Sequence, residues 1–248
     1  GTKGAIADSG SGWGLATLWL LLSGVGKVVS IGDPSRIPWI ARVAEESRRR
    51  DLLPAAELKL VDRLIGPRDE GSLPGAGDRS LDVCLLHDTL EHIAPRTLPV
   101  LFRLCHRSLR PGGQLISVSH NSENPQVMRS LEELWERVER DEYRPRRRAF
   151  IQSRLPGRTT EEVERLADAA RGLDRAEIEQ LLLEPSASPA QGHPPARRAP
   201  IDIDCDVVEE GYTDRAYVMP ALRQAGFSVR AYPFVRTRRR TAWLQGLV

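Results

Sequence analysis

Three glycines at alternate positions, Gly10, Gly12 and Gly14, stand between a short apolar run and a longer helix-like one. Because glycine has no Cβ, such a turn can be tight and a ligand can lie against its backbone. Asp8 precedes the glycines, and a second acid, Asp33, ends the next apolar run about one β–α–β half-unit later. This spacing favours a nucleotide-type cofactor.

The spacing also separates two classes of cofactor. The dinucleotide fingerprint G-x-G-x-x-G requires a small residue at position 15, where this chain has Leu15, so a simple dehydrogenase is disfavoured. The pattern acid-x-G-x-G-x-G resembles motif I of the class I S-adenosylmethionine (SAM) dependent methyltransferases. A tight turn without a ligand is the alternative for the three glycines.

Strand-like and helix-like runs alternate over the first half of the chain, which predicts a parallel sheet with helices on both faces. The strand-like runs are 5–8, 28–32, 58–61, 82–87 and 114–119. The helix-like runs are 14–23, 36–50 and 96–109.

The resemblance continues beyond the glycine turn. Residues 80–93 are similar to the family's fourth-strand motif, 109–118 to its turn into the fifth strand, and 225–229 to the entry of its last hairpin. The resemblance implies a Rossmann-like, doubly wound, seven-stranded α/β sheet that is mostly parallel, with an antiparallel last strand and a helical insert. We expect a short helix that starts at Pro220 and stops at Gly226, followed by the last strand pair at 227–232 and 241–245.

The resemblance assigns cofactor contacts to a set of residues along the carboxyl edge of this sheet. They are Asp8, Gly10, Ser11, Gly12, Gly14, Asp33, Asp69, Glu70 and His87. Asp33 would hold the ribose hydroxyls, and Asp69-Glu70 the adenine amino group. As alternatives, Asp33 is a loop acid or helix N-cap, Asp69 and Glu70 are loop acids, and Asp62 replaces Asp69 if the third strand is longer.

Two histidines at carboxyl ends of strands, His87 and His120, are candidate general bases, because neutral imidazole accepts a proton near pH 7. Alternatively, His120 only hydrogen-bonds its own loop. We expect His92 to be structural. No Asn-Pro-Pro-aromatic sequence follows the fourth strand, which argues against nucleobase or glutamine amino groups as acceptors.

The domain organisation that we predict has three parts. A SAM-binding core covers 1–125, a helical insert with a proline-rich linker at 185–200 covers 126–200, and residues 201–248 return to the core sheet. Insert helices are expected from possible capping boxes at 130–133, 159–162 and 174–177. Trp19 and Trp135 lie on helical stripes and are expected in cores.

Charge gives little support for a nucleic-acid partner, because 36 basic and 34 acidic residues leave a net charge of +2. Nearby acids neutralise the basic cluster 144–148, which predicts a salt-bridged face. The less compensated arginines are Arg236, Arg238, Arg239 and Arg240. They leave RNA as an unfavoured partner.

The three cysteines lack metal-ligand spacing, so we expect buried thiols and no metal. No membrane span or signal peptide is recognised, and we expect a cytoplasmic protein. The first strand begins near residue 5, where relatives carry an N-terminal helical segment, so the chain looks trimmed or short there.

These features predict a SAM-dependent methyltransferase that transfers a methyl group by SN2 displacement to a hydroxyl of a small molecule or glycan intermediate. The alternatives are an RNA or protein methyltransferase and a SAM-binding module without catalysis. The sequence does not predict the oligomeric state.

Overall fold

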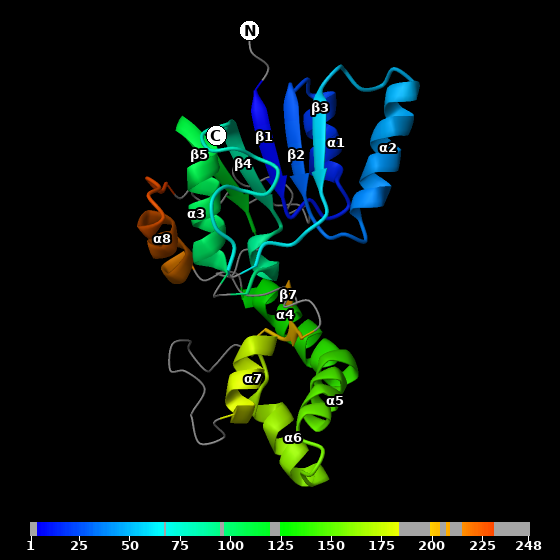
Figure 1. Ribbon diagram of the computed structural model, residues 1–248, viewed down its shortest axis with the longest axis vertical. Helices are drawn as coiled ribbons and strands as arrows, with labels where there is room; N and C mark the ends of the chain where they lie inside the picture. Colours follow the sequence, from blue (N-terminus) through cyan, green and yellow to red (C-terminus); the bar gives the residue numbers. More distant parts are fainter. Residues whose placement is uncertain are drawn as a thin grey trace. The chain divides into compact units, whose positions relative to one another are not determined.

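The computed structural model divides the chain into two compact units (Figure 1). The first unit comprises 1–90, 95–119 and 215–248, and the second comprises 91–94 and 120–214. The residues that the structure describes are 4–66, 68–94, 97–119, 125–183, 199–203, 207–208 and 215–230.

The first unit is built on a five-stranded parallel sheet in the order β3-β2-β1-β4-β5. Its elements are β1 (Ala5–Ser9), α1 (Leu15–Leu22), β2 (Lys27–Ile31), α2 (Ile37–Arg49), β3 (Glu57–Val61), β4 (Leu81–His87), α3 (Leu98–Ser108), β5 (Leu109–Val118) and α8 (Arg215–Gln224). The expected α/β class and parallel sheet are therefore confirmed.

The strand order reverses between β1 and β4, which are neighbours although two other strands separate them in sequence. Right-handed crossovers then place α1 and α2 on one face of the sheet and α3 on the other. In open α/β sheets, the crevice outside the carboxyl ends of the strands at such a reversal is the usual ligand site. A ligand site is therefore expected at the carboxyl ends of β1 and β4.

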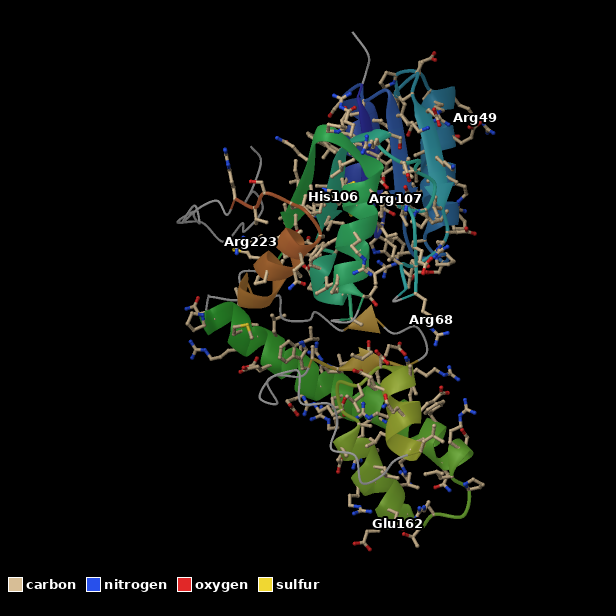
Figure 2. All side chains as sticks on the ribbon, turned by 60° about the vertical axis from the view of Figure 1, so that its left-hand side comes forward. Arg49, Arg68, His106, Arg107, Glu162 and Arg223 are labelled. Atoms are coloured by element: carbon tan, nitrogen blue, oxygen red, sulfur yellow. The ribbon has the colours of Figure 1, made fainter. Side chains whose placement is uncertain are left out.

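Helix α8 packs on α3, and the two helices lie next to each other in both views (Figures 1 and 2, with His106 labelled on α3 and Arg223 on α8). Phe227 meets the His106 ring edge-on at 5.1 Å between centroids. Gly226 has φ +101°, and a Cβ there would lie 2.8 Å from His106 Nε2. The Gly-Phe pair of the last motif thus packs against α3.

The C-terminal part of the first unit differs from the prediction in two ways. Helix α8 begins at Arg215 and contains Pro220, which we expected at the helix start. Residues 227–230 form no strand, and 231–248 lie outside the described residues. A seven-stranded sheet with an antiparallel last strand remains a prediction.

The expectation that Trp19 lies in the core is wrong, because its side chain is 58% exposed. Helix α1 is apolar on nearly every side, so its periodicity does not identify the buried face. Leu20 and Leu21 pack on Val28 of β2, while Leu15 is exposed like Trp19. Trp135, by contrast, is buried as expected.

The second unit is mainly helical. Its elements are α4 (Pro125–Val138), a π-helical turn η2 (Glu139–Tyr143), α5 (Arg144–Arg154), α6 (Thr160–Ala169), α7 (Arg175–Leu183), β6 (Ile201–Asp202) and β7 (Val207–Val208). A core joins α5, α6 and α7 through Ile151, Val163 and Ile178, all fully buried. This confirms a helical segment after the fifth strand.

Two of the three expected capping boxes are present. Thr159 Oγ1 accepts from the Glu162 backbone N–H at 3.3 Å, and the Glu162 carboxylate accepts from Thr159 N at 3.0 Å (Glu162 is labelled in Figure 2). Asp174 and Glu177 make the same reciprocal pair. The box expected at Ser130 is wrong, because α4 already begins at Pro125.

The boundary that we expected at residue 200 differs from the division of the structure. Residues 199–203 and 207–208 belong to the second unit, where β6 and β7 pair antiparallel as a separate two-stranded sheet. Within the second unit, Ile201 packs against Ala94 and Ala199. These residues therefore do not extend the five-stranded sheet.

Arg147 and Glu139 form a buried ion pair inside the second unit, with exposed fractions of 1% and 6%. Arg147 Nε also donates to the Ala167 carbonyl at 2.8 Å, so the guanidinium ties η2 and α5 to α6. Arg144, Arg146 and Arg148 each pair with acids nearer the surface. The basic cluster 144–148 is therefore a salt-bridged face, as expected.

Replacing Glu139 by Ala should destabilise the protein by about 3–5 kcal/mol, because Arg147 would remain buried without a counter-charge. Asp168→Ala, which removes a partner of the more exposed Arg144, is the matched control and should cost less than about 1 kcal/mol. Urea unfolding followed by circular dichroism at 222 nm measures both.

The double variant Glu139→Leu/Arg147→Met should recover most of that loss, because it removes both charges together. A double variant as unstable as Glu139→Ala would show that the loss comes from packing and not from the unpaired charge.

Candidate functional site

The loop between β1 and α1 is held against the end of β2. The backbone N–H groups of Gly10 and Ser11 both donate to the Ile31 carbonyl, at 2.9 and 3.0 Å. The Gly14 N–H donates to the Ser11 carbonyl at 2.7 Å, which closes the turn into α1. The loop therefore lies along the carboxyl ends of two neighbouring strands.

The three loop glycines all have positive φ, but their surroundings differ. A Cβ on Gly10 would lie 2.5 Å from Thr89 Oγ1, and one on Gly14 would lie 2.7 Å from Ile40 Cγ1. A Cβ on Gly12 would meet nothing closer than 3.9 Å. Gly10 and Gly14 are thus required by packing, whereas a Cβ on Gly12 would make only ordinary van der Waals contacts.

Asp8 ends β1 beneath this loop and is 1% exposed. Its Oδ2 accepts a 2.6 Å hydrogen bond from Thr17 of α1, whose hydroxyl also lies 3.0 Å from Ser30 Oγ of β2. Burial raises the pKa of Asp8, while the Thr17 hydrogen bond and the charge of His87 lower it by less. The Thr17 hydrogen bond therefore fixes the position of the carboxyl group, while burial disfavours its ionised form.

Asp33 follows β2 and is half-buried. Its Oδ1 accepts from the Ser35 backbone N–H at 2.7 Å, an arrangement that opens the turn into α2. Hydrogen bonds from Ser35, assisted by the charge of Arg36, lower the pKa of Asp33. A carboxylate oxygen can accept more than one hydrogen bond, so this half-buried acid can also accept from a ligand hydroxyl.

His87, the last residue of β4, lies beside two carboxylates. Its Nδ1 is 3.4 Å from Asp88 Oδ2, and its charge acts on Asp8. Asp88 has φ +46°, an uncommon conformation for a residue other than glycine, and its N–H donates to the Val118 carbonyl. Strained residues of this kind cluster at functional sites.

Thr89 joins the two strand ends. Its buried hydroxyl lies 2.9 Å from the Ser9 carbonyl and 3.1 Å from that of His87, directly under Gly10. The structure thus brings Asp8, the glycine loop and His87 together at the β1/β4 reversal.

The residues present fit a bound SAM on two observations. Ser11 Oγ is buried, and no hydrogen-bond partner for it lies within the described ranges. In the same loop, Gly12 has room beside its backbone for an additional group. A buried polar atom without a partner beside a glycine cradle is what a ligand with polar groups would satisfy.

The acids expected at the adenine end lie in the loop after β3. Both carboxylate oxygens of Asp69 are engaged within that loop, by Arg63 and by the Gly66 backbone N–H. Glu70 is exposed. Asp62 directly follows Val61, whose carbonyl accepts a hydrogen bond from the Gly32 N–H just after β2. Asp62 is therefore nearer in sequence than Asp69 to the residue that contacts the end of β2. Asp69 and Glu70 remain predictions, as does Asp62.

Several expected residues cannot be placed. His120 and Arg236, Arg238, Arg239 and Arg240 lie outside the described residues. The structure adds Thr89 and Arg36, which the sequence did not single out. Thr89 lies inside the fourth-strand motif, which was the one available signal for it.

Among the described ranges, no cluster of three metal-ligating side chains is present. In the same ranges, none of the helices has the length and apolar character needed to cross a bilayer. Cys84 and Cys105 are buried and not disulfide-bonded, as expected, and Cys205 is not among the described residues.

Comparison with known proteins gives one family match, described as a methyltransferase domain, over residues 7–117. No curated protein matches the chain. A SAM-dependent methyltransferase from Methanosarcina mazei is similar over 53% of this chain and 59% of its own, at 20% identity and a TM-score of 0.40.

Two further solved structures are similar to part of the chain. A SAM-dependent methyltransferase from Mesorhizobium loti shares 18% identity over 46% of this chain and 45% of its own, with a TM-score of 0.36. A geranyl diphosphate C-methyltransferase from Streptomyces coelicolor A3(2) shares 17% identity over 47% and 39%, with a TM-score of 0.37. The chain thus spans less than two thirds of the length of each of these structures.

The matched segment runs from Ala7 within β1 to Ser117 within β5, and it includes the glycine loop and the reversal between β1 and β4. Residues 7–117 therefore match a methyltransferase domain.

Proposed function

We propose that the chain is a SAM-dependent methyltransferase that acts on a hydroxyl of a small molecule or glycan intermediate. The observation that carries this proposal is the glycine loop, in which Gly12 leaves room beside the backbone and the buried Ser11 hydroxyl has no hydrogen-bond partner among the described residues. Gly12 serves the left-handed turn, and it would also allow a ligand to approach the backbone closely.

Three groups would hold the cofactor. Asp33 Oδ2 would accept from a ribose hydroxyl, the Gly12 backbone would allow close approach, and Asp8 would support the amino end of the methionine. When bound, SAM supplies a methyl group activated by the positive charge on sulfur. Most of the acceleration would come from alignment, which contributes about 7–11 kcal/mol for well-placed reactants.

His87 would act on the acceptor. The carboxylate of Asp88 faces Nδ1, so we expect the proton on Nδ1 and a lone pair on Nε2. As the acceptor oxygen bonds to the methyl carbon and the carbon–sulfur bond breaks, Nε2 would take the hydroxyl proton. His120 remains the alternative base.

The rival functions make different demands. An RNA methyltransferase needs exposed cations, but the described cluster 144–148 is paired with acids, so nothing here favours it. A SAM-binding module without catalysis would bind and show no turnover.

Calorimetric titration of the whole chain with SAM and with S-adenosylhomocysteine at pH 7.5 tests the cofactor. Micromolar binding of either supports the proposal, and no binding to folded protein contradicts it. Formation of S-adenosylhomocysteine with a panel of hydroxylated small molecules then separates an enzyme from a binding module.

Gly12→Ala should leave the protein folded but weaken SAM binding by at least about tenfold, because a methyl group would occupy the space where the cofactor approaches. The left-handed φ of +50° adds strain of about 1–2 kcal/mol. Gly24→Ala is the matched control, with φ +81° and nothing within 4 Å. It should carry similar strain and bind SAM normally, so equal losses of binding would show that strain alone is responsible.

Asp33→Asn should weaken SAM binding by at least about tenfold, the cost expected when one charged hydrogen-bonding group is lost. The asparagine carbonyl can still accept from Ser35 N, so the turn into α2 and the unfolding midpoint should change little. Calorimetry and thermal unfolding measure the two effects. Unchanged affinity would remove Asp33 from the site.

Asp8→Asn should stabilise the protein at neutral pH while weakening SAM binding. The pKa of Asp8 in the folded state lies above its ordinary 3.8, so wild-type stability falls as pH rises from that value through the folded pKa. The variant lacks this loss, and its advantage should grow over the same pH window and then level off. Urea unfolding of both proteins between pH 4 and pH 8 measures the difference, and a difference independent of pH would contradict the assignment.

A further inference from the structure

A cluster of two tryptophans and one arginine borders the glycine loop and has no role in the function proposed above. Trp13, inside the loop, is 58% exposed, and its ring meets Trp39 of α2 edge-on at 6.0 Å. The Arg36 guanidinium lies over the Trp13 ring, 4.9 Å from its centroid. Two elements of the site are thus joined by a cation–π contact.

Apart from the neighbours of Gly12 in the chain, Arg36 is the side chain nearest to where a Cβ on Gly12 would lie. Its Nη1 lies 3.9 Å from the position of a Cβ on Gly12, and the other atom at that distance is the Gly10 carbonyl oxygen. Anything that binds against Gly12 therefore comes next to a guanidinium.

The guanidinium has hydrogen-bonding capacity that the protein does not use. Stacking on Trp13 engages one face and leaves the N–H groups at its edge available. Among the described residues, none accepts a hydrogen bond from this side chain; its contacts are with Trp13 and, through its charge, with Asp33. An edge donor beside an open space is suited to an oxygen atom of a ligand.

Arg36 also belongs to the turn that carries Asp33. Its backbone N–H donates to the Asp33 carbonyl at 2.9 Å, so the two side chains leave the same turn. A ribose hydroxyl is both a donor and an acceptor, and Asp33 can only accept when ionised. An acceptor and a donor on one turn together match the hydroxyl pair of a ribose.

We propose that Arg36 is a further cofactor-binding residue that donates a hydrogen bond to a ribose hydroxyl, and that Trp13 is the positioning residue that holds it beside Gly12. This inference rests on the proposed function, because it takes SAM as the ligand of the glycine loop. It assigns the ribose, and not the methionine carboxylate, as the group that Arg36 contacts.

Two ligands separate these groups. S-adenosylhomocysteine carries both the ribose and the amino-acid carboxylate, whereas 5′-methylthioadenosine carries the ribose alone. Calorimetric titration of the full chain at pH 7.5 keeps Asp33 ionised in every variant, so a loss of binding cannot come from its protonation.

Arg36→Met should weaken the binding of both ligands by the same factor, at least about tenfold, as expected when a charged hydrogen-bond donor is lost. Arg42→Met, which replaces an exposed arginine within the following helix α2, is the matched control and should leave both affinities unchanged. A loss for S-adenosylhomocysteine alone would assign Arg36 to the carboxylate and overturn the proposal, as would no loss at all.

Trp13→Leu should weaken the binding of both ligands in the wild-type background. In the Arg36→Met background it should cause no further loss of affinity, because Trp13 acts only through Arg36. Trp19→Leu is its control, since Trp19 has the same exposed fraction of 58%. Additive losses would show that Trp13 contacts the ligand directly. If the wild-type protein binds neither ligand, the proposed function fails as well, an outcome distinct from normal binding by Arg36→Met.

Discussion

The close approach of the β1–α1 loop to its neighbours is the constraint on which the site depends. One carbonyl, that of Ile31, accepts both the Gly10 and the Ser11 N–H groups, so the loop cannot move away from β2 without losing two hydrogen bonds. Thr89 and Ile40 fill the space under Gly10 and Gly14. Four elements of the first unit, β1, β2, β4 and α2, are thereby held around one turn.

Because of this packing, the three glycines have different roles. Two of them permit contacts within the protein, so their replacement changes the fold before it changes binding. The middle one permits a contact that the protein itself does not make. The left-handed backbone of Gly12 by itself favours glycine, and the room beside it would let a ligand lie against the loop.

The elements of the sheet could be predicted from sequence because strand and helix periods alternate there, and β1 to β5 begin within two residues of the expected starts except where β5 extends back to Leu109. Helix α1 was predicted, but its buried face was not, since an apolar helix has no moment to orient it. The predicted start of α8 at Pro220 is wrong, because proline is common in the first turn of a helix but here lies inside one.

Site residues that stand at the ends of strands could be predicted from the sequence. Site residues that depend on contacts between distant parts of the chain could not. Asp8, Asp33 and His87 follow apolar runs, so their place at the carboxyl edge follows from parallel pairing. Thr89 and Arg36 act through distant partners, Ser9 in one case and Trp13 in the other, and no local pattern specifies such contacts. Asp8 shows the same logic in energetic terms: burial raises its pKa at the carboxyl end of β1, where a cationic group of a bound ligand would favour the ionised acid.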